Sequence, residues 1–215
     1  MSLRGNGGKE ISNKIAGGRQ FYISYFVIAS IVALILYALF QKPEEAVKMI
    51  YRAAGTLGYL FIFLAIVSSE YMARTKKILG AGFIKAHHSL SRLGVLLMII
   101  HPLAFAVEEQ SILVFLPVFY PPGKFLELAG RPAFYLFLLA AGVAVYRKKY
   151  RNWRKVHYLN YLAFLLVSVH AVMIGTDFES NLSRVLALAM TIIVIGIFVH
   201  KRFRLKIKKL FNPDR

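Results

Sequence analysis

The sequence predicts an all-α membrane protein, a six-transmembrane-helix bundle whose N and C termini are both cytoplasmic. Three observations carry this prediction. The 215-residue chain is 58% hydrophobic with a mean hydropathy of +0.56, which is too apolar for an ordinary soluble domain. Six apolar segments are long enough to cross the roughly 30 Å bilayer core as helices. The basic residues between these segments alternate sharply from side to side.

The six apolar segments lie near residues 21–40, 51–70, 86–107, 130–147, 157–175 and 182–200. The first follows a basic stretch, as in a signal peptide, but its apolar run is too long for an h-region and no small-residue cleavage site follows. We therefore expect a retained helix. The loop at about 108–129 is apolar and contains three prolines. We expect it to lie at the outer interface or to cap the bundle.

Charge sets the orientation of the bundle. The N-terminal tail, the loops after the second and fourth helices and the C-terminal tail carry four, four, six and seven Lys and Arg residues, which makes 21 of the 28. The other side holds seven of the ten acidic residues. Because Lys and Arg are enriched in cytoplasmic loops, both termini are expected inside. The chain then divides into a cytoplasmic basic tail at 1–20, a six-helix domain at 21–200 and a cytoplasmic basic tail at 201–215, in the cell (inner) membrane.

Composition excludes several classes of function. The formal net charge is +18, but the basic residues cluster between apolar runs and not along an exposed face, so the expected partner is the lipid bilayer and not a nucleic acid. The chain contains no cysteine, which excludes disulfides, iron–sulfur ligation and the C-x-x-C-H attachment of c-type haem. Any haem would be held by coordination and packing alone.

Four histidines lie within the apolar segments, His87 and His101 in the third and His157 and His170 in the fifth. Both segments run from inside to outside in the expected topology. His87 and His157 therefore lie near the cytoplasmic face, and His101 and His170 lie roughly 20 Å further out, at about 1.5 Å per residue. Each level then offers one imidazole from each helix. Because an imidazole is costly to bury in lipid without a partner, the pairs indicate function.

Helical phase supports this pairing in one helix only. His87 and His101 are 14 residues apart, about 1,400°, so they point within roughly 40° of each other. His157 and His170 are 13 residues apart, about 1,300°, so they diverge by roughly 140° on a straight helix. Tilt, different rotamers or a local irregularity of the fifth helix would have to make up the difference.

The histidines favour haem iron as their metal. Catalytic zinc usually adds a carboxylate or a third histidine, and no acid lies close to these four within the segments. Two trans imidazoles suit haem iron and leave it without an open coordination site, which favours outer-sphere electron transfer. The simpler alternative is four unrelated membrane histidines that make interhelical hydrogen bonds, and two pairs at matching depths argue against it.

Four further residues are candidates near the haems, and three of them have two interpretations. Gly94, halfway between the histidines of the third segment, would let a flat macrocycle approach or would serve helix–helix packing. Arg92 would pair with a haem propionate or snorkel to the inner face. Arg52, at the outer end of the second helix, would serve an outer propionate. Phe164 would sit between two haems or pack in the core.

The two histidine segments resemble the ferric reductase-like transmembrane family. HHSLSRLGVLLMIIH, from His87 to His101, is similar to the third-helix motif of that family, H-x-x-L-x-R followed by a second His after thirteen intervening residues. WRKVHYLNYLAFLLVSVH, from Trp153 to His170, is similar to the fifth-helix motif, with twelve intervening residues. The uneven spacing is a trait of the family, which includes NADPH oxidases, metalloreductases and the haem-binding membrane subunit of a bacterial methionine sulfoxide reductase system. The resemblance covers essentially the whole chain.

The resemblance implies a membrane cytochrome with two haem b groups, the inner held by His87 and His157 and the outer by His101 and His170. It implies a component of an oxidoreductase that passes electrons across the membrane. The donor would be a cytoplasmic flavoprotein reductase or free reduced flavin, since the sequence has no flavin domain of its own. The acceptor would lie at the periplasmic or extracellular face.

Two alternatives stay open on the sequence. The chain would be a haem subunit that donates electrons to one dedicated periplasmic reductase, such as methionine sulfoxide reductase, although those subunits often lack the first third-helix histidine that is present here. The second alternative is a membrane transporter or metal-binding protein without redox chemistry. Inverted repeats or broken helices would favour that class, and the sequence shows neither.

Overall fold

The computed structural model describes residues 26–41, 43–79 and 82–211, and these residues form helices and connecting turns without a β-strand. The basic tail at 1–20 and the residues at 21–25 and 212–215 lie outside this description. The elements are an apolar helix at Phe26–Phe40, α2 (Ala46–Leu79), α3 (Gly82–Glu108), η1 (Ile112–Phe115), α4 (Pro122–Glu127), α5 (Gly130–Val145), α6 (Trp153–His157), α7 (Leu159–Ile174), η2 (Thr176–Phe178) and α8 (Asn181–Phe211).

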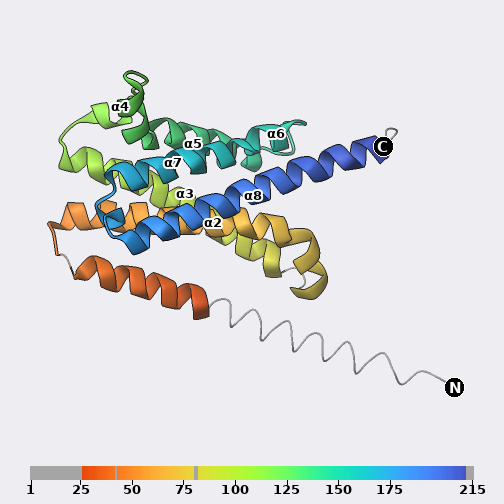
Figure 1. Cartoon of the computed structure of the whole chain (residues 1–215), viewed down its shortest axis with the longest axis horizontal. Helices are drawn as coiled ribbons and strands as arrows, with labels where there is room; N and C mark the ends of the chain where they lie inside the picture. Colours follow the sequence, from red (N-terminus) through yellow and green to blue (C-terminus); the bar gives the residue numbers. More distant parts are fainter. Residues whose placement is uncertain (1–25, 42, 80–81, 212–215) are drawn as a thin grey trace.

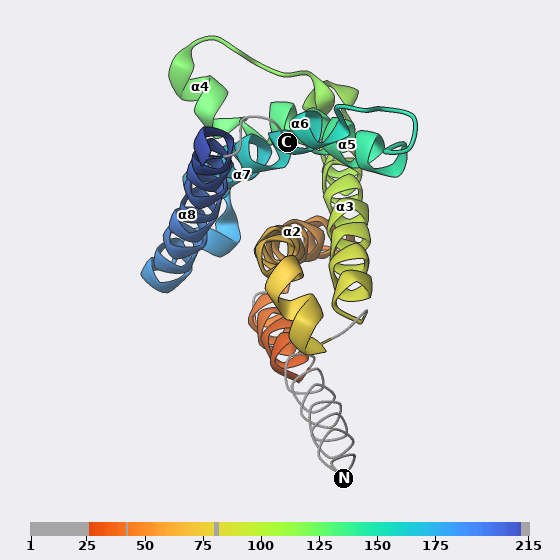
Figure 2. The same cartoon turned by 90° about the vertical axis from the view of Figure 1, so that its right-hand side faces the viewer.

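The long helices lie side by side and run alternately in opposite directions, with α4 at one end of the bundle and α6 at the other (Figure 1). Helix α2 packs most extensively on α3, and α5 packs on α7. The view along the bundle shows α2, α3, α5, α7 and α8 grouped together and the Phe26–Phe40 helix on the outside, next to α2 (Figure 2). The up-and-down order places successive connections at opposite ends, as the charge alternation requires.

Among the described residues, four helices are long and apolar enough to cross a membrane, which indicates a membrane protein. Their apolar spans are Ala46–Ser69, Lys85–Glu108, Trp153–Ile174 and Asn181–Phe203. The span of α2 is 39% buried within the bundle, whereas that of α8 is 11% buried, so α2 lies centrally and α8 turns most of its surface outward. The Phe26–Phe40 helix and α5 are also apolar but shorter. The helices α2 and α8 both extend past the segments expected from hydropathy.

The fifth apolar segment is interrupted one residue after His157. Helix α6 ends at His157 and α7 begins at Leu159, so only Tyr158 separates the two helices. Tyr158 caps both helices, and the Tyr161 N–H bonds back to its carbonyl at 3.1 Å, a step of three residues in place of four. A three-residue step winds the chain more tightly than a regular α-helix and changes the phase between His157 and His170. Of the three ways to reconcile the phase of these histidines, a local irregularity is therefore present in this helix.

The core joins four of the helices at mid-height. Its side chains include Tyr59 and Ile62 from α2, Phe137 from α5, Phe164 from α7 and Val194 from α8. Phe164 and Val194 are the largest side chains that are completely buried. The partly buried Met98 of α3 packs against these residues, so the core also contacts the helix that carries His87 and His101.

The apolar loop between α3 and α5 caps one end of the bundle. Val114, in η1, is buried, whereas Ile112 and Tyr120 are more than 80% exposed. Arg131, at the start of α5, ties the loop down, because its Nη1 donates to the carbonyls of Leu113 at 3.1 Å and Leu116 at 3.0 Å. The sequence left two positions open for this loop, at the outer interface or over the end of the bundle. The buried Val114 and the bonds from Arg131 favour the second.

Candidate haem-binding histidine pairs

His101 of α3 and His170 of α7 line one cavity of about 340 Å³ between α2, α3, α5 and α7. The two imidazoles are close enough to interact electrostatically. Most of the other side chains around the cavity are apolar, and they include Phe164 and Phe137 from the core. Small-molecule and cofactor sites have this size and apolar character, with a few polar groups that fix the ligand.

Both rings of this outer pair are held by main-chain carbonyls. His101 Nδ1 lies 2.8 Å from the carbonyl oxygen of Tyr51, and His170 Nδ1 lies 2.7 Å from that of Glu127. A carbonyl only accepts, so each Nδ1 carries the hydrogen and donates it. In a neutral imidazole the lone pair then resides on Nε2, which leaves that atom available to a metal. Metal-binding histidines are commonly oriented in this way.

The inner pair repeats the arrangement near the other end of the bundle. His87 Nδ1 lies 3.0 Å from the carbonyl of Ala65, and His157 Nδ1 lies 3.0 Å from the carbonyl of Ala140. The hydroxyl of Ser68 is also 3.0 Å from His87 Nδ1. His87 and His157 are again close enough to interact electrostatically. All four predicted ligands are therefore partly buried, paired as expected and oriented through Nδ1.

The acceptor carbonyls follow the spacing of the histidines. The two acceptors on α2 are 14 residues apart, as are the two histidines of α3 that they hold. The two acceptors before and within α5 are 13 residues apart, as are the histidines of α6 and α7. One partner segment thus orients both histidines of each ligand helix. The unequal spacing of the two histidine pairs is therefore matched by the spacing of the carbonyls that accept their hydrogen bonds.

Two glycines give the outer imidazoles room. A Cβ built on Gly55 of α2 would lie 2.8 Å from His101 Nδ1, and one built on Gly130 of α5 would lie 2.8 Å from His170 Cδ2 and 2.9 Å from its Nε2. Any other residue at either position would push the ring away or shift the helix. The absence of a side chain at these positions therefore lets each ring rest against the neighbouring backbone.

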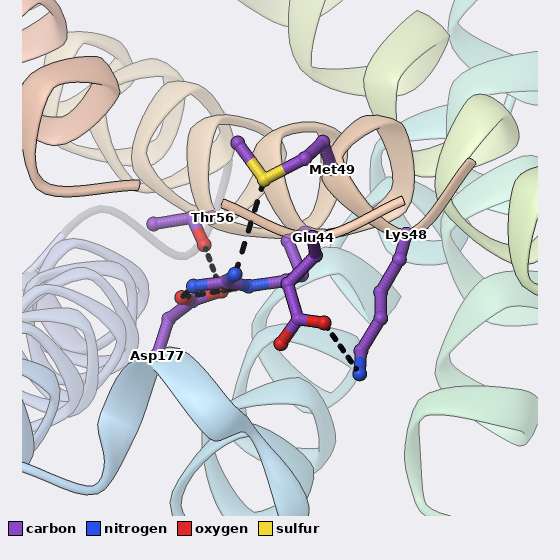
Figure 3. Close-up of polar contacts among 6 residues, drawn as sticks. Glu44, Lys48, Met49, Thr56 and Asp177 are labelled. Atoms are coloured by element: carbon purple, nitrogen blue, oxygen red, sulfur yellow. Dashed lines mark hydrogen bonds and ion pairs between the residues drawn. The ribbon is translucent and has the colours of Figure 1, made fainter. Parts of the chain in front are cut away.

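Arg52 has a protein partner at the outer end of the cavity. Its guanidinium forms an ion pair with Asp177 of η2, with 3.2 Å between Nε and Oδ1, and its side chain is 5% exposed. The hydroxyl of Thr56 donates to the same carboxylate at 3.4 Å. Figure 3 shows Thr56 and Asp177 facing each other, with Glu44 and Lys48 forming a separate ion pair nearby. Arg52, Arg131 and Asp177 all line the cavity.

Gly94 lies in the interface of α3 with α2, and Arg92 lies on an exposed face. A Cβ on Gly94 would stand 2.9 Å from Ile62 Cγ1 and 3.2 Å from the Ile62 backbone nitrogen, so Gly94 permits the close approach of α3 to α2. The Arg92 side chain is exposed, and its Nε donates to the carbonyl of His88 at 3.2 Å. The cavity at the outer histidine pair is lined by other residues, and Arg92 lies five residues after the inner ligand His87 along α3.

The completely buried Phe164 lies between the two histidine levels. Its ring stacks on that of Tyr59, with centroids 4.9 Å apart and planes 8° apart. The Tyr59 hydroxyl is 2.9 Å from that of Ser168, which donates to the Phe164 carbonyl at 2.8 Å. Phe164 lines the outer cavity and also belongs to the core, so its two sequence interpretations are compatible.

Sequence reasoning missed several residues of the site. They are Gly55 and Gly130, which seat the outer rings, Asp177, which pairs with Arg52, and Arg131, which holds the outer loop. A small residue in an apolar segment signals close packing but does not say what approaches. The acid Asp177 lies 125 residues from its partner, and only the fold brings them together.

The residues present fit a bis-imidazole haem better than a compact metal site. At the outer pair, two imidazole lone pairs from different helices, an apolar cavity and the glycines beside the rings would suit a flat cofactor such as haem. Among the described residues, His, Asp and Glu nowhere gather in a group of three that could hold a metal ion.

Comparison of the chain with protein-family models, curated proteins and solved structures finds no match in any of the three.

Proposed function

We propose that this chain is a b-type dihaem membrane cytochrome that passes electrons from one face of the membrane to the other. The observation that carries the proposal is the common orientation of four imidazoles. Each is held through Nδ1 by a main-chain carbonyl, at 2.7 to 3.0 Å, and the four are grouped as an inner and an outer pair. Unrelated membrane histidines would also form interhelical hydrogen bonds, so it is the grouping into two pairs at two levels that favours this proposal.

The chain's own residues would bind and orient the two cofactors. His87 and His157 supply one Nε2 each to the inner haem, and His101 and His170 do the same for the outer. A haem held by these imidazoles would supply one-electron transfer and would bind no substrate directly. The acceptor carbonyls hold the rings in place during this change of charge. Arg131 and the Arg52–Asp177 pair leave the outer end of the cavity with a net positive charge, which favours propionates there.

The direction of transfer comes from topology and resemblance. Six spans, made by the four long helices, α5 and the Phe26–Phe40 helix, with both termini in the cytoplasm, put the inner pair at the cytoplasmic face of the cell membrane. The motifs similar to the ferric reductase-like family support a cytoplasmic flavin donor and an outer acceptor. With an inside-negative membrane potential, outward electron transfer is then downhill by about 2.3 kcal/mol per 100 mV.

The test is the reduced-minus-oxidised visible spectrum of the purified protein together with haem quantitation. A low-spin b-type spectrum with about two haems per chain is the expected result. His101→Ala should remove the outer haem alone, and His87→Ala the inner haem alone. Protein that contains no haem after expression with ample haem supply would refute the proposal. Retention of both haems in both variants would refute the assignment of the ligands.

A further inference from the structure

The turn between α5 and α6 carries a concentrated positive charge. Its basic residues all lie between positions 147 and 155 and all are exposed: Arg147, Lys148, Lys149, Arg151, Arg154 and Lys155. The sequence has no acidic residue between Glu127 and Asp177, and within the described part of the chain none of these cations forms an ion pair with an acid. The turn therefore presents its charge to a partner outside the bundle.

The turn begins and ends beside apolar helices, which places it at the depth of the lipid headgroups. Helix α5 ends at Val145, and the next apolar span begins at Trp153. Main-chain hydrogen bonds fold the connection back on itself, since the Lys149 N–H donates to the Tyr146 carbonyl at 2.9 Å and the Trp153 N–H donates to the Tyr150 carbonyl at 3.2 Å. The polar layer on each side of the hydrocarbon core is roughly 5–8 Å thick, so a connection this compact stays within it.

Aromatic side chains are interleaved with these cations. Tyr146 is 63% exposed and Tyr150 is 51% exposed, and Val145 before them is 77% exposed. Trp153, the only tryptophan of the chain, is partly exposed, and the Arg154 guanidinium carbon lies 5.5 Å from its ring centroid. Tyr and Trp are enriched at membrane–water interfaces because each has an apolar ring and a polar end. The rings therefore suit the headgroup layer better than bulk water, which would leave their apolar faces exposed.

We propose that the turn at 146–155 binds the phosphate groups of anionic phospholipids in the leaflet that it borders. Lys and Arg bind phosphate through charge-assisted hydrogen bonds, and clusters of about four to eight basic residues beside a membrane span attract acidic lipids. Tyr146, Tyr150 and Trp153 lie among the headgroups and hold the turn at that depth. This binding needs no haem and goes beyond the proposed electron transfer.

Two other roles for the same charges lead to different observations. Charges that only orient the chain act during membrane insertion and give the folded protein no preference for one lipid over another. An acidic soluble protein would bind the turn from the aqueous side, with Tyr150 in contact with water or protein and not with lipid. The lipid affinity of the folded protein and the surroundings of Tyr150 therefore distinguish the three roles.

The first measurement is the affinity of the full-length protein in non-ionic detergent for phosphatidylglycerol and for phosphatidylcholine with the same acyl chains, by native mass spectrometry. We expect phosphatidylglycerol to bind about tenfold more tightly or more, with a smaller preference at higher salt. Lys148→Gln with Lys149→Gln should weaken its binding about tenfold. Lys48→Gln with Lys124→Gln is the control, because it changes the net charge equally at the opposite end of the bundle and should retain the preference. Equal unfolding temperatures show that both variants fold.

The second measurement locates the bound lipid while every charge of the turn is kept. Tyr150→p-benzoylphenylalanine places a photoreactive ring at an exposed position, and the protein is irradiated in nanodiscs in which phosphatidylglycerol is the minor lipid and phosphatidylcholine the major one. We expect lipid adducts at position 150 in which phosphatidylglycerol exceeds its share of the bilayer. The same substitution at Phe119, a 70% exposed position in the loop at the opposite end, is the control, and any lipid adducts there should follow the bulk composition.

The outcomes separate this inference from the proposed function. Equal affinity for the two lipids overturns the lipid site. A preference that both double variants lose to the same extent would reflect net charge alone and also overturns it. Irradiated protein without lipid at position 150 would place the turn in water, as a soluble acidic partner requires, with the same consequence. Protein that contains no haem but prefers phosphatidylglycerol through Lys148 and Lys149 would refute the proposed function and support the lipid site.

Discussion

The imidazole of His170 rests directly against Gly130. A methyl group added at Gly130 would stand 2.8 Å from His170 Cδ2 and 2.9 Å from Nε2, the atom with the free lone pair. The same imidazole donates from Nδ1 to the Glu127 carbonyl at 2.7 Å, three residues before Gly130. The segment that leads into α5 therefore fixes both the position and the orientation of this ring.

Gly130→Ala should therefore weaken the outer haem without unfolding the protein. Displacing the ring breaks the geometry that its carbonyl partner sets, and losses of this kind cost roughly 10- to 100-fold in metal affinity. Haem titration should show one weakened site of two. Gly142→Ala is a matched control in the same helix, because a Cβ there meets nothing within 4 Å. Equal haem affinity in the two variants would contradict the role given to Gly130.

Gly94→Ala should lower thermal stability while the haem spectrum stays that of the wild type. The new methyl group would collide with Ile62 and force α3 away from α2, at a cost of about 1–3 kcal/mol. Gly196→Ala in α8 is the control, since its Cβ meets nothing and alanine favours the helix by about 0.5–1 kcal/mol. Thermal unfolding in detergent measures both. A selective loss of haem in Gly94→Ala at unchanged stability would favour the macrocycle interpretation instead.

Asp177→Asn should destabilise the outer end of the bundle. Removing one partner leaves the Arg52 charge buried, which typically costs about 3–5 kcal/mol. Replacing both Arg52 and Asp177 by leucine should recover much of this loss, because no buried charge remains. Glu44→Gln, in the partly exposed pair with Lys48, should leave the unfolding temperature unchanged. An Asp177→Asn variant as stable as the wild type would show that the pair is hydrated.

Phe164→Ala should be among the most destabilising single changes in the core. Its side chain is fully buried and stacked on Tyr59, and removing a large buried aromatic ring costs about 3–5 kcal/mol. Phe164→Leu should cost much less because it fills most of the volume. Phe119→Ala, at a position 70% exposed, is the control and should change little. Similar unfolding temperatures for all three variants would contradict the central position of Phe164.

Single cysteines should report the orientation of the bundle against an empty background, because the chain contains none. Lys149→Cys lies in the exposed turn before α6, and Glu109→Cys lies in the exposed stretch after α3. In intact cells an impermeant maleimide should label Glu109→Cys and not Lys149→Cys. Labelling of both after the membrane is opened is the control. The reverse pattern would overturn the assignment of the inner and outer pairs.

Hydropathy and spacing predicted much of the arrangement because they are local properties. A long apolar run favours a helix wherever it stands, so the four long spans and the all-helical architecture followed from the sequence. The partner of each histidine also followed, since alternating helices place residues of equal depth together. A local irregularity was one of three ways to reconcile the phase of His157 and His170, and its position at Tyr158 depends on packing that spacing does not encode.

The sequence by itself determined which residues are buried in helices, how the helices alternate and which histidines share a level. Only the tertiary structure decided what surrounds each imidazole. The carbonyls of Tyr51 and Glu127 carry no sequence signal, because every residue has the same main-chain acceptor. Gly130 and the Arg52–Asp177 pair likewise acquire their roles from neighbours distant in the chain. The depth of a histidine depends on its position along one helix, whereas the orientation of its imidazole depends on contacts with neighbouring helices.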